Sequence, residues 1–386
     1  MRILFLNANL AGCGTYHRAL WFARICARHG HHATLCTVAR DRWWTRHEWH
    51  EPRLRVSEGP RWGYTWLPGH GSNWLDIFWR WHELRTGSYD VVYAFEYHPN
   101  VAWPVYAALG PRQILLSDWC DWYAGAANVM RGNRWLHAWD RRREEHIRHC
   151  AARISVISSA LADRARAIGI PPSRITLLRE GVDTTTMRPC DRASAKASLG
   201  IPADTVVIGT LNDGQALPHL LSAFAAFAPR VPHARLLFIG QPPTSFLAHA
   251  ARLSLSHRLV ITGRCSDAAL PRLLSAADIC ALPLEDTCVN RARFPHKIGD
   301  YLACGAAVLL TRVGDYPAML DAAGAAYVVN SLADIPDALE HLARDAELRA
   351  HLGATGRAWV ARTLDWSVLA PQILNFVEGA PTPSSP

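Results

Sequence analysis

No CxxC pair occurs in the sequence, although its 386 residues include ten cysteines. Scattered cysteines of this kind match neither a zinc knuckle nor a small disulfide scaffold, so we expect a reduced, cytoplasmic protein. No segment reaches the roughly 18 apolar residues that a membrane-spanning helix needs. The apolar start is interrupted by Asn7 and Asn9, before a signal peptide's apolar region would be complete, and it therefore predicts a buried first strand.

Two common nucleotide-binding motifs are also missing. The chain has no GxxxxGK(S/T) loop, which excludes a P-loop site. A GxGxxG fingerprint would need glycine where the chain has His17, and no acidic residue follows the second predicted strand at the expected distance of about 20 residues. NAD and FAD are therefore disfavoured. Since no DxD motif is clear either, we predict neither a metal nor a cofactor.

Positive charge is what the chain has in excess. Its formal charge is +8 at pH 7 and its pI is about 9.1. This balance favours anionic ligands such as nucleotides, phosphates, nucleic acids or anionic lipids, without choosing among them. Nucleic-acid binding would be steeply dependent on salt, but no nucleic-acid module is recognisable, so no nucleic-acid partner is predicted.

Apolar runs alternate with longer amphipathic stretches, which is typical of β-α-β units with parallel strands. A first series of predicted strands covers residues 2–8, 31–38, 90–96, 112–118, 153–158 and 174–180, and a second covers residues 206–212, 234–240, 258–263, 279–284 and 306–312. A polar stretch without a strand-length apolar run separates the two series. At roughly 100 to 200 residues per domain, this pattern predicts an α/β protein with two Rossmann-like domains.

We place the N-terminal domain at residues 1–182 and the C-terminal domain at residues 183–360. Residues 361–378 are predicted to form a C-terminal crossover helix kinked at Pro371, and residues 379–386, which lack apolar anchors, a disordered tail. Ligands of Rossmann-like sheets lie beyond the carboxyl ends of the strands. We therefore expect the carboxyl ends of the two parallel sheets to face each other across a ligand-binding cleft.

Residues 41–85 form an unusually aromatic and basic segment. Its tryptophans are Trp43, Trp44, Trp49, Trp62, Trp66, Trp74, Trp79 and Trp81. Tryptophan stacks on sugars and bases and also lies at membrane interfaces. Three interpretations stay open: packing against the first domain, a wall of an acceptor site, or peripheral contact with a membrane.

Several blocks of the sequence resemble a known family. These blocks are AGCGTYHRAL after the first strand, GVDTTTMRP at the domain junction, ARLLFIG, VITGRCSDAALPRLLSAADICALPL and FPHKIGDYLACGAAVLLTRVGD. Together they resemble the group 1 (family 4) retaining glycosyltransferases of the GT-B fold over nearly the whole length. The resemblance implies metal-independent transfer, with retention, of a sugar from a UDP-, GDP- or dTDP-sugar to a hydroxyl acceptor, in natural-product or surface-glycan biosynthesis.

The donor site that the resemblance implies lies mainly in the second domain. Asp300 stands where the family has a glutamate that accepts hydrogen bonds from ribose hydroxyls. Arg293 and Lys297 lie near the same helix start and are suited to the diphosphate, because an arginine binds two phosphate oxygens at once. A solvated basic loop is the alternative. Arg264 follows VITG, where the family lines the base pocket; a surface arginine on a turn is the alternative. Asn290 belongs to the same segment as Arg293.

The first domain contributes further candidates. Gly12 and Gly14 form a loop that leads into a helix, whose N-terminus attracts anions, and we count them with the donor site.

Asp118 and Asp121 follow a buried strand and are the predicted catalytic carboxylates, able to bind hydroxyls or to accept the proton of the attacking hydroxyl. Helix capping is the alternative role for these aspartates. Arg18, Glu96 and Trp122 are the predicted acceptor-binding residues, and membership of a structural pair is the alternative role of Arg18 and of Glu96.

The chain also departs from the family pattern. An arginine and a lysine that hold the donor phosphates in most relatives are replaced by Thr210 and Gln215, and the first glutamate of the paired-glutamate motif is Ala292. We hypothesise that Arg291, Arg293 and Lys297 supply the missing positive charge. The alternative is a protein that has kept the fold and lost the reaction, and that binds a sugar nucleotide or partners an active transferase.

Overall fold

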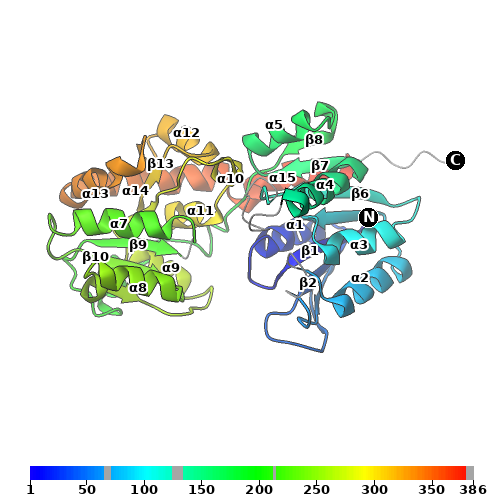
Figure 1. Cartoon of the computed structure of the whole chain (residues 1–386), viewed down its shortest axis with the longest axis horizontal. Coiled ribbons are helices and arrows are strands. Elements are labelled where there is room, and N and C mark those ends of the chain that lie inside the picture. The colour runs from blue at the N-terminus through cyan, green and yellow to red at the C-terminus, as the bar shows by residue number, and fades with distance from the viewer. Residues whose placement is uncertain (65–70, 124–133, 212–213, 380–386) are drawn as a thin grey trace. The chain divides into compact units, whose positions relative to one another are not determined.

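The computed structural model describes residues 1–64, 71–123, 134–211 and 214–379, with a secondary-structure assignment for each (Figure 1). It separates into two compact units. Unit 1 comprises Met1–Arg179 and the segment from Leu369 onward, and unit 2 comprises Glu180–Val368. The sequence pattern predicts this boundary three residues later, after residue 182. All but the first residue of the predicted tail, 379–386, lies outside the described residues.

Unit 1 is built on an eight-stranded sheet with the order β3-β4-β2-β1-β5-β6-β7-β8. Every neighbouring pair is parallel except β3 and β4. The strands are β1 (Arg2–Leu10), β2 (His32–Val38), β3 (His47–Glu51), β4 (Leu54–Gly59), β5 (Val91–Phe95), β6 (Ile114–Trp119), β7 (Arg153–Val156) and β8 (Ile175–Leu177).

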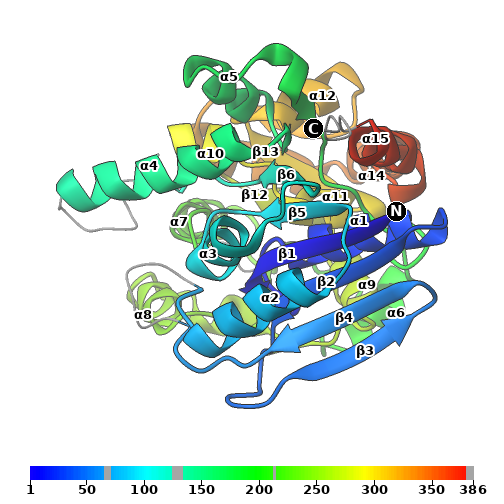
Figure 2. The ribbon, with the colours of Figure 1, turned by 90° about the vertical axis from the view of Figure 1, so that its right-hand side faces the viewer.

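The sequence pattern did not predict β3 and β4, which form an antiparallel hairpin at one edge of the sheet (Figure 2). Their sequences, HEWHE and LRVSEG, are too polar to stand out as buried strands. Ion pairs support them instead, because Glu48 of β3 lies 2.5 Å from Arg46 and 3.1 Å from Arg55 of β4. Charged residues of this kind also protect an edge strand from pairing with other chains.

The helices of unit 1 are α1 (Tyr16–Arg28), α2 (Trp74–Thr86), α3 (Pro99–Ala108), α4 (Arg134–Cys150) and α5 (Ser159–Ala167). The last helix of the chain, α15 (Trp366–Glu378), begins in unit 2 and ends in unit 1. In unit 1 its Phe376 ring lies 5.6 Å from the Tyr93 ring of β5.

Unit 2 is built on a six-stranded, fully parallel sheet with the order β11-β10-β9-β12-β13-β14. Its strands are β9 (Val207–Leu211), β10 (Arg235–Ile239), β11 (Leu259–Ile261), β12 (Ile279–Leu282), β13 (Ala307–Thr311) and β14 (Tyr327–Val329). The pattern predicted all of these strands except the short β14.

The remaining helices of unit 2 are α6 (Arg192–Ala197), α7 (Leu217–Phe227), α8 (Thr244–Arg252), α9 (Leu270–Ser275), α10 (Cys288–Ala292), α11 (His296–Ala303), α12 (Asp315–Ala322), α13 (Ile335–Arg344) and α14 (Ala346–Thr363). Phe224 of α7 and Leu339 of α13 are fully buried in one core with Ile208 of β9 and Phe238 of β10. This arrangement confirms the predicted pair of Rossmann-like domains.

The strand orders place a topological switch point in each sheet. In unit 1 the chain goes from β1 to β2 on one side and then to β5 on the other. In unit 2 it goes from β9 to β10 and later returns to β12 on the other side of β9. Because ligands of such sheets bind at the carboxyl ends next to the switch point, the residues that follow β1, β5, β9 and β12 are where a site is expected.

No helix among the described residues is both long and apolar enough to cross a membrane. All ten cysteines are free thiols.

Candidate functional site

The loop after β1 is held by a network of short polar side chains. Thr15 Oγ1 donates to Asn7 Oδ1 over 2.7 Å and accepts from Asn9 Nδ2 over 2.8 Å. Thr37 at the end of β2 donates to the Asn9 carbonyl over 2.8 Å. The two asparagines that interrupt the first apolar run therefore fix the turn into α1.

Both predicted glycines in this loop are exposed and have positive φ, +74° at Gly12 and +54° at Gly14. An added Cβ on Gly14 would lie 2.8 Å from Asn9 Nδ2. The loop thus needs glycine at residue 14 both for its backbone conformation and for space.

Arg18 and Asp118 form a bidentate ion pair inside unit 1. The Nε–Oδ2 and Nη2–Oδ1 distances are both 3.0 Å, and the two side chains are 1% and 0% exposed. Arg18 also donates to the carbonyls of Leu178 and Arg179, while Asp118 accepts from Ser155 and from the Cys120 thiol. Every oxygen of Asp118 is therefore bonded inside the protein.

Glu96 is also fully buried, immediately after β5. Its carboxylate accepts from the Cys120 amide over 3.1 Å and pairs with Arg148 at 3.3 Å. Burial raises the pKa of Glu96 well above its usual value, although Arg148 opposes this. Glu96 has a φ of +72°, a region that costs a non-glycine residue about 1–3 kcal/mol and is most often retained at functional sites.

Asp121 and Trp122 follow β6 and are half-buried. The Arg164 guanidinium lies 5.4 Å from the centre of the Trp122 ring. The Asp121 carboxylate is near enough to Glu96 to raise the pKa of that group. The structure thus brings Asp118, Asp121 and Glu96 to the carboxyl ends of β5 and β6. Of these three carboxylates Asp121 retains solvent exposure, so it is the one best placed to receive a proton from an incoming hydroxyl.

In unit 2, Asp300 lies on α11 beside a histidine that the sequence analysis did not identify. His296 Nε2 is 3.4 Å from Asp300 Oδ1, and His296 Nδ1 is 3.4 Å from Glu180 Oε1. Burial lowers the pKa of His296, but the two carboxylates outweigh it and raise the pKa to about 9. At pH 7 His296 is therefore a cation between two buried carboxylates. In the sequence, the only indication of a role for His296 is its position between Pro295 and Lys297.

Arg293 and Asn290 are in contact. Arg293 Nη1 donates to Asn290 Oδ1 over 3.3 Å, and Asn290 Nδ2 donates to the Glu285 carbonyl over 2.9 Å. Asn290 is buried, whereas Arg293 and Lys297 are half-buried. Arg293 also lines a recess of about 10 Å³ with Leu282 of β12 and Thr311 of β13. Its guanidinium therefore belongs to the carboxyl edge of the sheet.

The other donor candidates are more scattered. Arg264 is exposed after β11, and two strands, β10 and β9, lie between β11 and β12. Arg291 is exposed and forms an ion pair with Asp286, with an Nε–Oδ1 distance of 2.5 Å. Thr210, at the family's arginine position, is fully buried, and Gln215 is exposed. The hypothesis of replacement cations thus rests on Arg293 and Lys297, because the charge of Arg291 is already neutralised.

Two family descriptions match the chain in succession. Residues 18–186 match "Glycosyltransferase Family 4" and residues 202–345 match "Glycosyl transferases group 1". A curated relative, the D-inositol 3-phosphate glycosyltransferase of Saccharomonospora viridis, is 29% identical over 254 residues, which cover 61% of this chain. The chain spans 58% of that relative's length.

Solved structures show the same fold at low identity. The sucrose-phosphate synthase of Thermosynechococcus elongatus has a TM-score of 0.78 at 17% identity, with 98% of each chain covered. Alr3699/HepE of Anabaena, in complex with UDP-glucose, has a TM-score of 0.72 at 15% identity, with 98% of this chain and 100% of that chain covered. These likenesses confirm the GT-B fold.

Proposed function

Because the chain belongs to the group 1 glycosyltransferases of family 4, we propose that it transfers a sugar from a nucleotide diphosphate sugar to a hydroxyl group of an acceptor, with retention at the anomeric carbon. One observation carries this proposal. At the switch point of unit 2, Arg293, Lys297 and Asp300 gather on α11 and the loop before it. Cations next to a buried carboxylate are what a diphosphate joined to a ribose requires.

In the proposed reaction unit 2 holds the donor. Asp300 accepts hydrogen bonds from ribose hydroxyls, and the cationic side chains of Arg293 and Lys297 stabilise the diphosphate as its bond to the sugar carbon breaks. Unit 1 carries the acceptor, whose oxygen forms the new bond to the same carbon. Asp121 receives or positions the proton that this hydroxyl gives up. No step uses a metal.

Binding of nucleotide sugars tests the proposal directly. UDP-glucose is the first donor to try, because the similar Anabaena structure contains it; GDP- and dTDP-sugars complete a calorimetric panel. We expect one nucleotide to bind saturably. Asp300→Asn should weaken that binding about tenfold, or ~1.4 kcal/mol, because an amide keeps only one of the two accepting oxygens and loses the charge.

Asp321→Asn is the matched control, since Asp321 is exposed and pairs with Arg312 at 2.9 Å. Its affinity should equal that of the parent protein. Failure of every nucleotide to bind would contradict the proposal. Binding without sugar transfer or donor hydrolysis would favour the catalytically silent alternative.

A second part of the proposal concerns membrane contact, and α2 supports it. Trp74, Phe78 and Trp81, at positions i, i+4 and i+7 of this helix, are 54%, 53% and 37% exposed. Aromatic side chains on one face of a surface helix are typical of interfacial membrane binding. Figure 2 shows α2 on the outside of unit 1. We propose that this face contacts an anionic bilayer on the cytoplasmic side, where the free cysteines would stay reduced.

The other tryptophans of residues 41–85 differ in exposure, so packing against unit 1 and exposure to a ligand or membrane each apply to some of them. Trp43 and Trp44 are 56% and 64% exposed, whereas Trp49 and Trp62 are half-buried. Trp66 lies outside the described residues. Packing against unit 1 therefore accounts for only part of the segment.

Vesicle co-sedimentation checks the membrane proposal. The double variant Phe78→Ser/Trp81→Ser should bind vesicles of phosphatidylcholine and phosphatidylglycerol about tenfold more weakly, because two aromatic rings no longer enter the interface. Trp139→Ser on α4, where Trp139 is 49% exposed, is the control and should bind as the parent does. Equal loss in both variants, or no binding by the parent, would refute the contact.

A further inference from the structure

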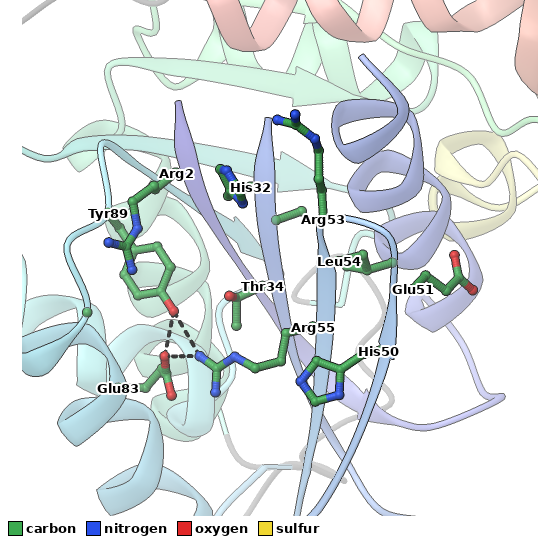
Figure 3. A pocket seen from close by; sticks show the side chains of 12 residues that line it. Arg2, His32, Thr34, His50, Glu51, Arg53, Leu54, Arg55, Glu83 and Tyr89 are labelled. Atoms are coloured by element: carbon green, nitrogen blue, oxygen red, sulfur yellow. Dashed lines mark hydrogen bonds and ion pairs between the residues drawn. The ribbon is translucent and has the colours of Figure 1, made fainter. Parts of the chain in front are cut away.

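A cavity of about 460 Å³ lies in unit 1, away from the candidate donor and acceptor residues (Figure 3). It is lined by the first residues of three parallel strands, Arg2 of β1, His32 of β2 and Leu54 of β4. The candidate donor and acceptor residues of this unit follow the carboxyl ends of the strands. The cavity lies at the other end of the same strands, where they begin. Its volume is that of a site for a small molecule, for which roughly 300–1,000 Å³ is usual.

One wall of the cavity is a closed hydrogen-bonded cluster. Glu83 of α2 accepts from Arg55 of β4 and from the Tyr89 hydroxyl, which also accepts from Arg55 over 3.1 Å (Figure 3). Burial opposes ionisation, but the hydrogen bonds from Arg55 and Tyr89 outweigh it and lower the pKa of Glu83. This wall is therefore ordered, and its charges cancel.

The second carboxylate that lines the cavity, Glu51, also has a partner inside the protein. Glu51 accepts from Arg24 Nη2 over 2.6 Å and from Arg24 Nε over 3.1 Å. The two carboxylates that line the cavity, Glu51 and Glu83, are thus balanced by Arg24 and Arg55. The other basic side chains of the cavity are not needed to neutralise them.

Four lining side chains are basic and have no carboxylate partner within the described part of the chain: Arg2, His32, His50 and Arg53. The Arg2 guanidinium lies 5.9 Å from the centre of the Tyr89 ring, and Arg53 Nη1 donates to the Gly30 carbonyl over 2.7 Å. Both contacts hold a guanidinium at the cavity without neutralising it. The guanidinium groups of Arg2 and Arg53 therefore bring positive charge to the cavity without an ion pair among the described residues, while the Asp90 carboxylate accepts from the Arg2 backbone amide over 2.7 Å.

The backbone of Arg53 is a second, independent observation. Arg53 is the last residue of the two-residue turn between β3 and β4 and has a φ of +61°. Turn positions with positive φ favour glycine or asparagine, because other residues are strained there. An arginine at this position bears a cost that glycine would remove, which is expected where the side chain itself is used.

We propose that this cavity is a second ligand site, for a small metabolite that carries a phosphate monoester. Arginine recognises a tetrahedral dianion through several charge-assisted hydrogen bonds, and Arg2, His32 and Arg53 are neighbours at the starts of β1, β2 and β4. Thr34 and Leu54 also line the cavity, and Thr34, the register partner of Arg55, is placed to contact the rest of the ligand. Because the site uses neither α11 nor the loop after β1, it does not depend on the proposed transfer reaction.

Calorimetry with glucose 6-phosphate and with inorganic phosphate tests the site. We expect one molecule of glucose 6-phosphate to bind per chain, more tightly than inorganic phosphate. Arg2→Gln and Arg53→Gly should each weaken binding about tenfold, since each removes one charge-assisted contact. Arg53→Gly should also raise the melting temperature, because it relieves the strained turn, so lost binding in this variant cannot be attributed to unfolding.

Two controls make the result decisive. Arg112→Gln removes one exposed positive charge outside the cavity and should bind glucose 6-phosphate as the parent protein does. The variant Arg293→Ala/Lys297→Ala, altered only in unit 2, should also bind it normally. The proposal is overturned if the parent binds neither phosphate, if inorganic phosphate binds as tightly as the ester, or if either control loses affinity.

Discussion

Replacing Asp118 by alanine is expected to lower the free energy of unfolding of unit 1 by about 3–5 kcal/mol. The reason is that Arg18 is 1% exposed and has Asp118 as its bidentate carboxylate partner. The variant would leave a buried guanidinium without its carboxylate, while it still donates to the backbone carbonyls of Leu178 and Arg179. It would also remove the acceptor for Ser155 and Cys120.

Urea denaturation followed by tryptophan fluorescence measures this loss. Of the 16 tryptophans, all except Trp359 and Trp366 lie in unit 1, so the signal reports mainly on that unit. Asp121→Ala is the control, because Asp121 is half-buried, and its unfolding should change by less than ~1 kcal/mol. The double variant Arg18→Met/Asp118→Leu should recover most of the stability, since apolar residues of similar volume can replace a buried ion pair.

A parent-like unfolding curve for Asp118→Ala would show that the ion pair is not what holds β6 and α1 together. The same variants also separate two roles for Asp118. If the double variant folds and still transfers sugar, Asp118 is a structural residue. If it folds but is inactive while Asp121→Ala is active, the Arg18–Asp118 pair is needed for the chemistry.

The double variant Arg293→Ala/Lys297→Ala is expected to lose donor affinity by roughly 10²–10⁴-fold. Each charge-assisted hydrogen bond to a phosphate contributes about 1.5–3 kcal/mol, and these two side chains are the candidates that replace the family's arginine and lysine. Both are half-buried on or just before α11. Calorimetric titration with the nucleotide that the parent protein binds gives the affinity, and the melting temperature checks the fold.

Arg291→Ala is the matched control for this prediction. Arg291 lies on α10, two residues before Arg293 in the same positive segment, but its guanidinium is paired with Asp286, so its removal should change donor affinity less than about twofold. A comparable loss in Arg291→Ala would mean that the overall charge of the loop, and not specific contact, attracts the donor. Unchanged affinity in the double variant would refute the replacement hypothesis.

Lysine chemistry offers an independent readout of the same site. Lys196 and Lys297 are the only two lysines of the chain. Lys196 Nζ is buried 2.8 Å from Asp278, which protects it. An amine-specific reagent should therefore modify Lys297 and the N-terminus, and bound donor should protect Lys297 alone.

The sequence predicted most of the fold because parallel strands covered on both faces are continuous apolar runs. It missed β3 and β4, whose pairing depends on ion pairs between residues that look like solvent-exposed loop residues. It also missed Glu180 and His296, because one follows β8 and the other begins α11, over a hundred residues later in the chain. Asn7 and Asn9 were recognised only as interruptions, although they position the glycine loop.

The class of this protein is readable from its sequence: two α/β units, a family 4 glycosyltransferase pattern, and charged or polar side chains in the loops at the carboxyl ends of strands. Those features follow from local periodicity and from short motifs, which a linear chain displays directly. Which charged side chains are available to a ligand depends on the ion pairs that form in the folded chain. The tertiary structure pairs Arg18 with Asp118, Arg148 with Glu96 and Arg291 with Asp286. It leaves the guanidinium groups of Arg2 and Arg53 without an ion pair to a carboxylate within the described residues. Burial and ion pairing depend on which residues, distant in sequence, come into contact in the folded chain. Neither local periodicity nor a short motif specifies those contacts.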